Sequence, residues 1–107
     1  MSYDPGLAAR VADVLEQLGE LGIRQKNVFG GRGFLVGKHT FLVVHDDGII
    51  AKVTPGDYQK ALKTPGVTPF APMGEKPMST WVVIEAEVVA DDPELTDWVR
   101  RTLASVR

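Results

Sequence analysis

The sequence predicts an α+β fold of two layers, in which an N-terminal, a middle and a C-terminal helix pack on an antiparallel, meander-type sheet of four to five strands. Two observations indicate this. Apolar residues recur at helical spacing near both ends of the chain. Between them lie short segments rich in β-branched and aromatic residues, separated by glycine turns. The expected element order is α-β-β-β-β-α-β-α, in a single domain over residues 1–107.

The two terminal helices have the clearest signals. Asp4 suits an N-cap and Pro5 the first helical position, and the apolar stripe that follows extends to Leu21, so Gly22 is the expected stop. The last helix is predicted to open at Asp92-Pro93. Its apolar face is made of residues at offsets of three, four, seven, eight and eleven: Leu95, Trp98, Val99, Thr102, Leu103 and Val106.

The middle of the chain predicts a sheet. Four strand-like segments, 23–29, 33–36, 40–45 and 49–53, are joined by turns that contain glycine. Thr54-Pro55 predicts a short helix over 55–63, and residues 67–79 are expected to form a loop. The apolar run 81–84 then predicts a strand in the centre of the sheet, because it is apolar on both faces.

Composition excludes several classes of protein. The 107 residues are 44% hydrophobic and 24% charged, which is typical of a globular domain. There is no cysteine, so disulfides and thiolate sites are excluded, and no segment predicts export or membrane spanning. We therefore expect a cytoplasmic protein that does not contact membranes. The net charge of −2 disfavours direct nucleic-acid binding, although Arg24, Lys26, Arg32 and Lys38 lie in a stretch without acids.

The glycine-rich segment "NVFGGRGFLVGKHTF" raises the question of a phosphate loop. Such loops join a strand to the N-terminus of a helix, whereas this one leads into another strand-like run. The favoured interpretation of Gly30 and Gly31 is a turn or bulge that allows close backbone packing. His39 and His45 do not predict a metal site, because they bracket one strand and stand roughly 20 Å apart. We expect no cofactor, no metal and no catalytic set.

A small-molecule pocket is one alternative. Large apolar side chains around the predicted loop 67–79 would form its walls, and lysines would meet an anionic group. The residues of this alternative are Phe70, Met73, Met78, Trp81, Lys52 and Lys76. The competing interpretation is that these side chains belong to the ordinary core and surface.

Four segments together resemble a known family: "SYDPGLAARV", "KNVFGGRGFLV", "AKVTPGDYQKALKTPGVTPF" and "GEKPMSTWVVIEAEVVADDPELTDWV". In this order they are similar to the N-terminal domain of the TfoX/Sxy competence regulators. The residues that match the family's motifs are Lys26, Phe29, Gly30, Gly31, Lys76, Pro77, Met78 and Trp81. Because the sequence ends at Arg107, soon after the last predicted helix, we expect a stand-alone domain without the second, C-terminal domain of the full-length regulators.

The resemblance implies a two-layer α+β domain and a regulatory role exerted through other proteins. Our first hypothesis is therefore a non-enzymatic interaction or regulatory domain, acting as a monomer or homodimer, with a partner protein that is unknown. The second is a small-ligand-binding or enzyme-accessory domain with a pocket near Trp81 and the 67–79 loop. Direct DNA binding through the basic stretch is the third.

Overall fold

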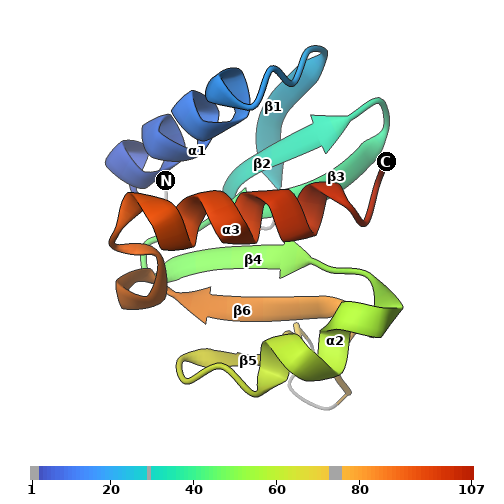
Figure 1. Ribbon diagram of the computed structural model, residues 1–107. Coiled ribbons are helices and arrows are strands. Elements are labelled where there is room, and N and C mark those ends of the chain that lie inside the picture. The colour runs from blue at the N-terminus through green and yellow to red at the C-terminus, as the bar shows by residue number, and fades with distance from the viewer. Residues whose placement is uncertain (1–2, 29, 73–75) are drawn as a thin grey trace.

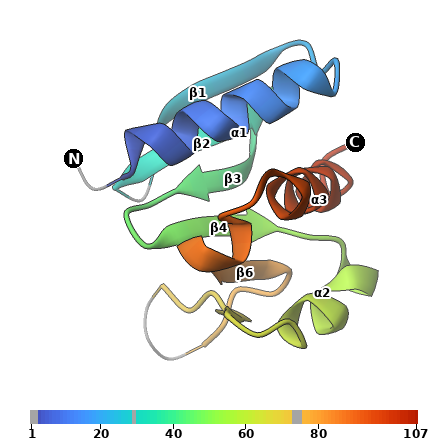
Figure 2. The same ribbon diagram turned by 60° about the vertical axis from the view of Figure 1, so that its left-hand side comes forward.

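The computed structural model describes residues 3–28, 30–72 and 76–107. It is a two-layer α+β fold with helices on one face of a six-stranded antiparallel sheet (Figures 1 and 2). The strand order across the sheet is β1-β2-β3-β4-β6-β5. The elements along the chain are α1 Pro5–Gln17, β1 Ile23–Val28, β2 Gly31–Val36, β3 His39–Val44, β4 Gly48–Lys52, α2 Pro55–Leu62, β5 Val67–Pro69, β6 Trp81–Glu85, the 3₁₀ helix η1 Ala86–Val89 and α3 Asp92–Leu103.

The predicted fold class, element order and helix starts are confirmed. The Asp4 carboxylate accepts hydrogen bonds from the N–H groups of Gly6 and Leu7, and the Thr54 hydroxyl accepts one from Asp57. Each cap satisfies N–H groups that lack an intrahelical acceptor. The central position of β6, between β4 and β5, is also confirmed.

The structure differs from the sequence-based prediction in three main places. α1 ends at Gln17 and not at Gly22, because Gly19 takes φ +76° directly after the C-cap Leu18. Leu21 therefore lies outside the helix and its apolar stripe. The predicted loop 67–79 begins with β5, which pairs with β6 and makes the sheet six-stranded. The helix η1 also has no counterpart in the sequence-based prediction.

The main core lies between the sheet and the helices. It joins Leu7, Val11 and Leu15 of α1 with Leu95 and Val99 of α3, all at most 5% exposed. The sheet contributes Phe34, Leu42, Ala51, Val82 and their neighbours. These residues occupy one face of the sheet because side chains alternate along a strand and register partners share a face.

The face without helices is also apolar. Leu35, Val43 and Ile50 alternate with the core residues of β2, β3 and β4 and are buried, although they lie outside the main core cluster. Val28 of β1 packs on this same face, over Gly33 of β2. A side-chain Cβ at Gly33 would lie 2.8 Å from the Val28 side chain, so Val28 occupies the space above that glycine.

The neighbouring glycines Gly30 and Gly31 are required for different reasons. Gly30 has φ +75° and open space around it, so it serves the turn. Gly31 lies in β2, and a Cβ there would lie 2.3 Å from the carbonyl oxygen of Val44. Only a residue without a side chain allows this approach between strands. The sequence-based interpretation of a turn with close backbone packing agrees with this geometry.

A buried hydroxyl anchors α3 to the sheet. Thr102 is fully buried, and its Oγ1 lies 2.5 Å from the carbonyl oxygens of Phe41 and Lys52. The register of β2 and β3 shifts between Phe34 and Leu35, which leaves Phe41 without a register partner. The bulge thus leaves a carbonyl that Thr102 can satisfy.

Candidate interaction surface

The candidate binding residues taken from the sequence, which are those of the family motifs and of the possible pocket, fall into two groups in the structure. Lys26 lies in β1, Gly30 lies in the turn from β1 into β2, and Gly31 is the first residue of β2. Lys52 and Trp81 are register partners on β4 and β6, on the face of the sheet without helices. Phe29 and Met73 belong to the same prediction but lie outside the described residues.

The two groups do not meet. Gly31 lies next to the Arg32–Val44 register pair, at the end of the sheet where Gly48 pairs with Glu85. Trp81 is at the opposite end of β6, three strands away from β2. With strands about 4.8 Å apart and residues about 3.3 Å apart along a strand, the separation is roughly 20 Å. A surface that joins the paired glycines to Trp81 is therefore not formed.

Lys76, Pro77 and Met78 are exposed and lie near Trp81 in the chain. The N–H of Trp81 donates to the carbonyl of Met78, and the N–H of Met78 donates to that of Phe70. The Phe70 N–H in turn donates to the Trp81 carbonyl. These bonds tie the ends of the connection between β5 and β6 to the start of β6.

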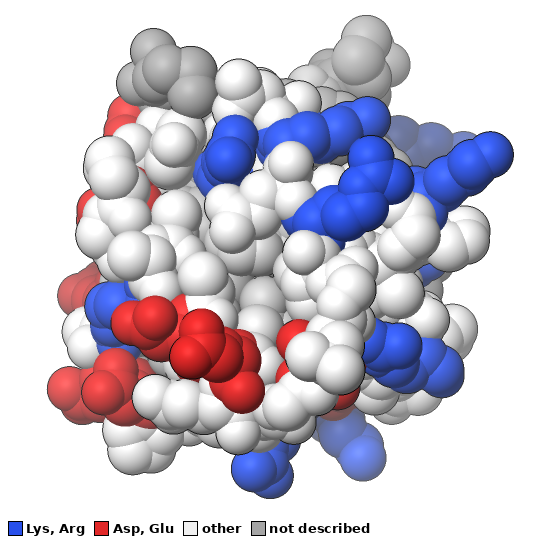
Figure 3. Space-filling view, turned by 90° about the horizontal axis from the view of Figure 1, so that it is seen from above, with Lys and Arg blue, Asp and Glu red and all other residues white. Residues whose placement is uncertain are grey.

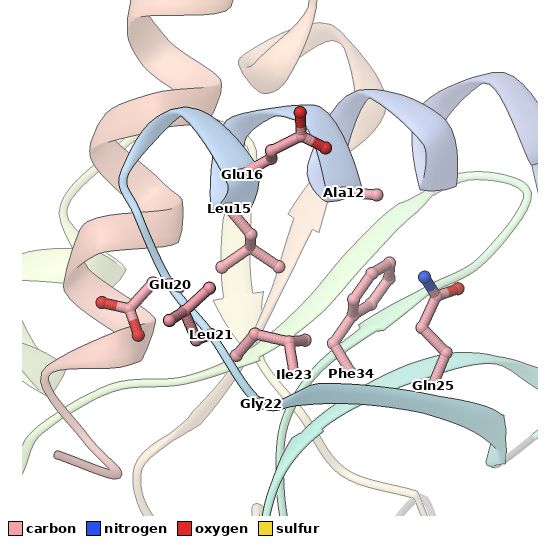
Figure 4. A pocket seen from close by; sticks show the side chains of 9 residues that line it. All are labelled: Ala12, Leu15, Glu16, Glu20, Leu21, Gly22, Ile23, Gln25 and Phe34. Carbon is pink, nitrogen blue, oxygen red and sulfur yellow. The ribbon is translucent and has the colours of Figure 1, made fainter.

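A groove that the sequence-based interpretation missed lies between α1 and the β1–β2 hairpin (Figure 4). Its volume is about 340 Å³. Leu15, Ile23 and Phe34 meet between the two elements, and Ala12 lines the helix side. Leu15 is 3% exposed and Phe34 is fully buried, so the floor of the groove is apolar, whereas Glu16, Glu20 and Gln25 place polar groups around it. None of the sequence-predicted site residues lines it.

Leu21 forms an apolar rim on this groove. It is 85% exposed, a high value for a large aliphatic side chain, and it lies in the connection between α1 and β1. Glu20, beside it, is bound by Arg107 at 2.5 Å, so its charge is compensated within the chain. The early end of α1 exposes Leu21. The Leu18-Gly19 pair was the sequence signal for that end, since glycine is common just after a helix C-cap.

The strand β1 borders the groove and forms one edge of the sheet. It runs along the upper margin of the molecule in Figure 2. Ile23 and Gln25 line the groove, so the alternation of a strand directs Arg24 and Lys26 to the other face. Both cations are exposed, and no acidic residue occurs between Leu21 and Phe41.

Charge is separated on the surface. In Figure 3 most of the visible Lys and Arg side chains lie apart from the Asp and Glu side chains, although some cationic side chains lie beside the acids. Not every cation on the hairpin is free to bind a partner. Arg32 donates to the side-chain oxygens of Gln25, at 3.1 Å, and Asn27, at 3.3 Å. Arg24 donates to the carbonyl of Gly37 at 3.4 Å, and both Arg24 and Lys26 are exposed on the helix-free side.

A bidentate ion pair joins α2 to α3. Arg101 donates to both oxygens of the Asp57 carboxylate, at 2.8 and 2.9 Å, and its guanidinium lies 3.9 Å from the Trp98 ring centroid. The hydrogen bond from Arg101 to Asp57 raises the pKa of the guanidinium above its ordinary value. This pair holds elements together and leaves neither group available for chemistry.

The two histidines do not belong to a metal-binding cluster in the described part of the chain. His39 begins β3 and His45 follows its end, and within residues 3–28, 30–72 and 76–107 no three His, Cys, Asp or Glu side chains could hold a metal ion. The Nε2 atom of His45 is buried and has no hydrogen-bond partner in that same part of the chain. A small apolar recess of about 200 Å³, lined by Ile50 and Val83, lies beside it.

The fold and this surface define a two-layer α+β domain with one open, basic sheet edge beside an apolar groove. The family model for the TfoX N-terminal domain matches residues 13–106, nearly the whole chain, so the chain belongs to the TfoX N-terminal domain family. This confirms the resemblance seen in the sequence. No curated protein is similar enough to count as a match. No helix in the described residues has both the length and the apolar character needed to cross a membrane.

Proposed function

We propose that this domain is a non-enzymatic interaction module that regulates other proteins, as its membership in the family of competence-regulator N-terminal domains suggests. The observation that carries the proposal is the open edge at β1. Two features that favour binding, an unpaired strand edge and an exposed leucine on an apolar groove, occur side by side there.

The roles of the polar side chains support a non-catalytic function. Asp57 and Arg101 hold α2 against α3, Thr102 satisfies backbone carbonyls, and Arg10 bonds Asp92 to join α1 to α3. Each of these groups has a structural task that explains its position. We propose that the domain acts in the cytoplasm, in keeping with a sequence that contains no cysteine.

A photo-crosslinking experiment tests this function. Benzoylphenylalanine replaces Leu21 at the rim of the groove, and a matched variant carries it at Lys60, an exposed position on α2. In cells that naturally produce the protein, we expect the Leu21 position to crosslink a protein that the Lys60 position does not. Identical crosslinking patterns from the two positions, or turnover of a metabolite by the purified domain, would overturn the proposal.

A further inference from the structure

We propose that the β1 edge binds an extended segment of a partner protein in which acidic and apolar residues alternate. This inference deepens the proposed function, on which it rests, by naming the site and the chemistry of the partner. The segment would add to the sheet as a seventh strand, with backbone hydrogen bonds to Ile23–Val28.

Only one edge of the sheet suits such an addition. β1 has six residues without proline, so each residue keeps its N–H. β5, at the other edge, has three residues and ends at Pro69, which has none. Six residues in strand conformation offer about 20 Å of edge. The length and composition of the two edges therefore direct an added strand to β1.

The two faces of β1 present different chemistry to an added strand. An added strand shares the alternation of the strand it joins, so its side chains would point in turn to the groove and to the helix-free face. On the groove side they would meet the apolar Leu21 and Ile23 at one end. Further along they would meet Gln25 and Asn27, which accept hydrogen bonds from Arg32. On the other side they would meet Arg24 and Lys26. Apolar residues fit the groove side beside Leu21 and Ile23, and acidic residues fit the other side.

The positive charge of β1 disfavours a second copy of this chain at the same edge. Pairing β1 with β1 of another molecule would bring Arg24 and Lys26 of both copies onto one face of the joined sheet. Like charges on neighbouring strands are destabilising. The charge of this edge thus favours an acidic segment over self-association, and it also discourages uncontrolled edge-to-edge aggregation.

The test uses a fluorescent peptide of about eight residues in which glutamate and valine alternate, long enough to cover β1. Its binding is followed by fluorescence anisotropy. One control peptide has the same composition with the glutamates and valines in separate blocks, and the other alternates lysine with valine. We expect the alternating acidic peptide to bind best, and its affinity to fall as salt is raised.

Four variants locate the binding. We expect Lys26→Glu and Arg24→Glu to weaken the affinity for the acidic peptide about tenfold each, because each replaces an attraction by a repulsion. Leu21→Glu should weaken it comparably, through loss of the apolar rim. Lys60→Glu changes charge by the same amount on α2 and should leave the affinity unchanged. Thermal melting of each variant checks that the fold is retained, as we expect for exposed positions.

Several outcomes would overturn the inference. Equal binding of the alternating and block peptides would show that charge alone is recognised. If Lys60→Glu weakens the affinity for the acidic peptide as much as the β1 variants do, charge alone is again what is recognised. Binding of a single-stranded oligonucleotide that depends on Lys26, without binding of the acidic peptide, would identify a nucleic-acid surface. Self-association abolished by Leu21→Glu, without peptide binding, would identify a dimer interface.

The two proposals can fail separately. If Leu21 crosslinks a partner protein but the acidic peptide does not bind, the interaction function stands and the chemistry assigned to the partner is wrong. If the peptide binds at β1 but the Leu21 position crosslinks nothing beyond the Lys60 control, the surface recognises such segments, and the proposed function in cells is wrong.

Discussion

The two edges of the sheet differ in length, charge and cover. β1 is six residues long and bears two exposed cations beside an apolar groove, whereas β5 is three residues long, ends in proline and lies against α2. An unpaired edge invites pairing by other chains, and short strands and prolines are ways in which proteins prevent it. The fold therefore blocks one edge sterically and leaves the other available to partners of suitable charge.

The largest effect on stability is expected at the β1 edge, from Gly31→Ala, which disturbs the hairpin that contains β1. A methyl group 2.3 Å from the Val44 carbonyl oxygen forces two paired strands apart. We expect a loss of about 3 kcal/mol in the free energy of unfolding, at the upper end of overpacking effects. Chemical denaturation measures it.

Gly30→Ala is the matched control, since the space around Gly30 is open and only its φ of +75° is unfavourable. It should cost about 1 kcal/mol. Equal losses for the two variants would contradict the distinction between a glycine needed for space and one needed for backbone conformation.

Thr102→Val should have the next largest effect. Valine keeps the shape of threonine but leaves the carbonyls of Phe41 and Lys52 without the hydroxyl. The expected loss is about 2 kcal/mol, the cost of leaving a buried polar group unsatisfied. Thr102→Ser, which keeps the hydroxyl, is the control. A valine variant as stable as the wild type in urea denaturation would show that water or backbone movement satisfies these carbonyls.

At the β5 end, Asp57→Asn should destabilise by about 1 kcal/mol, because the pair with Arg101 is only partly buried and solvent screens it. The raised pKa of Arg101 determines the pH dependence of this group. Its contribution to stability is fully present below the unfolded-state pKa and is lost as the pH rises through the folded-state value, in strongly alkaline solution.

Melting curves of the wild type and of Asp57→Asn between neutral and moderately alkaline pH provide the measurement. The difference in stability attributed to Arg101 should stay constant over that window. A difference that disappears in mildly alkaline buffer would contradict the assignment to a guanidinium whose pKa is raised.

The smallest effect on stability is expected from Leu21→Ser. Leu21 lines the same groove as Leu15 but is 85% exposed, against 3% for Leu15. Leu21→Ser should change the free energy of unfolding by less than about 0.5 kcal/mol, whereas Leu15→Ala should cost about 3 kcal/mol. Differential scanning calorimetry of the two variants separates the rim of the groove from its floor. A large loss in the free energy of unfolding for Leu21→Ser would mean that this leucine contributes to the stability of the fold and is not simply a binding residue.

The sequence predicted the fold better than it predicted the site, and particular residues show why. Asp4-Pro5 and Thr54-Pro55 are local signals, and they located the helix starts correctly. β5 was missed because three residues give no usable periodicity, and its pairing with β6 depends on tertiary structure. The groove was missed because it joins α1 to β2, and Phe34 and Leu15 are distant in sequence.

The sequence named Gly31 and Trp81 as candidate binding residues without showing how far apart the fold places them. Family motifs mark residues that matter, but they do not show which strands lie side by side. The strand order, with β6 inserted between β4 and β5, separates Trp81 from the hairpin. Gly19 is the sequence signal that α1 ends before Leu21 and leaves that leucine outside the helix.

The central claim is that β1, and not β5, is the binding edge. Backbone amide chemical shifts, followed by NMR during titration with the alternating glutamate–valine peptide, test it most directly. The account predicts shifts in Ile23–Val28 and in Leu21, slowed hydrogen exchange at alternate amides of β1, and no change in Val67–Pro69. Shifts concentrated on β5 and around Trp81, with β1 unaffected, would contradict it.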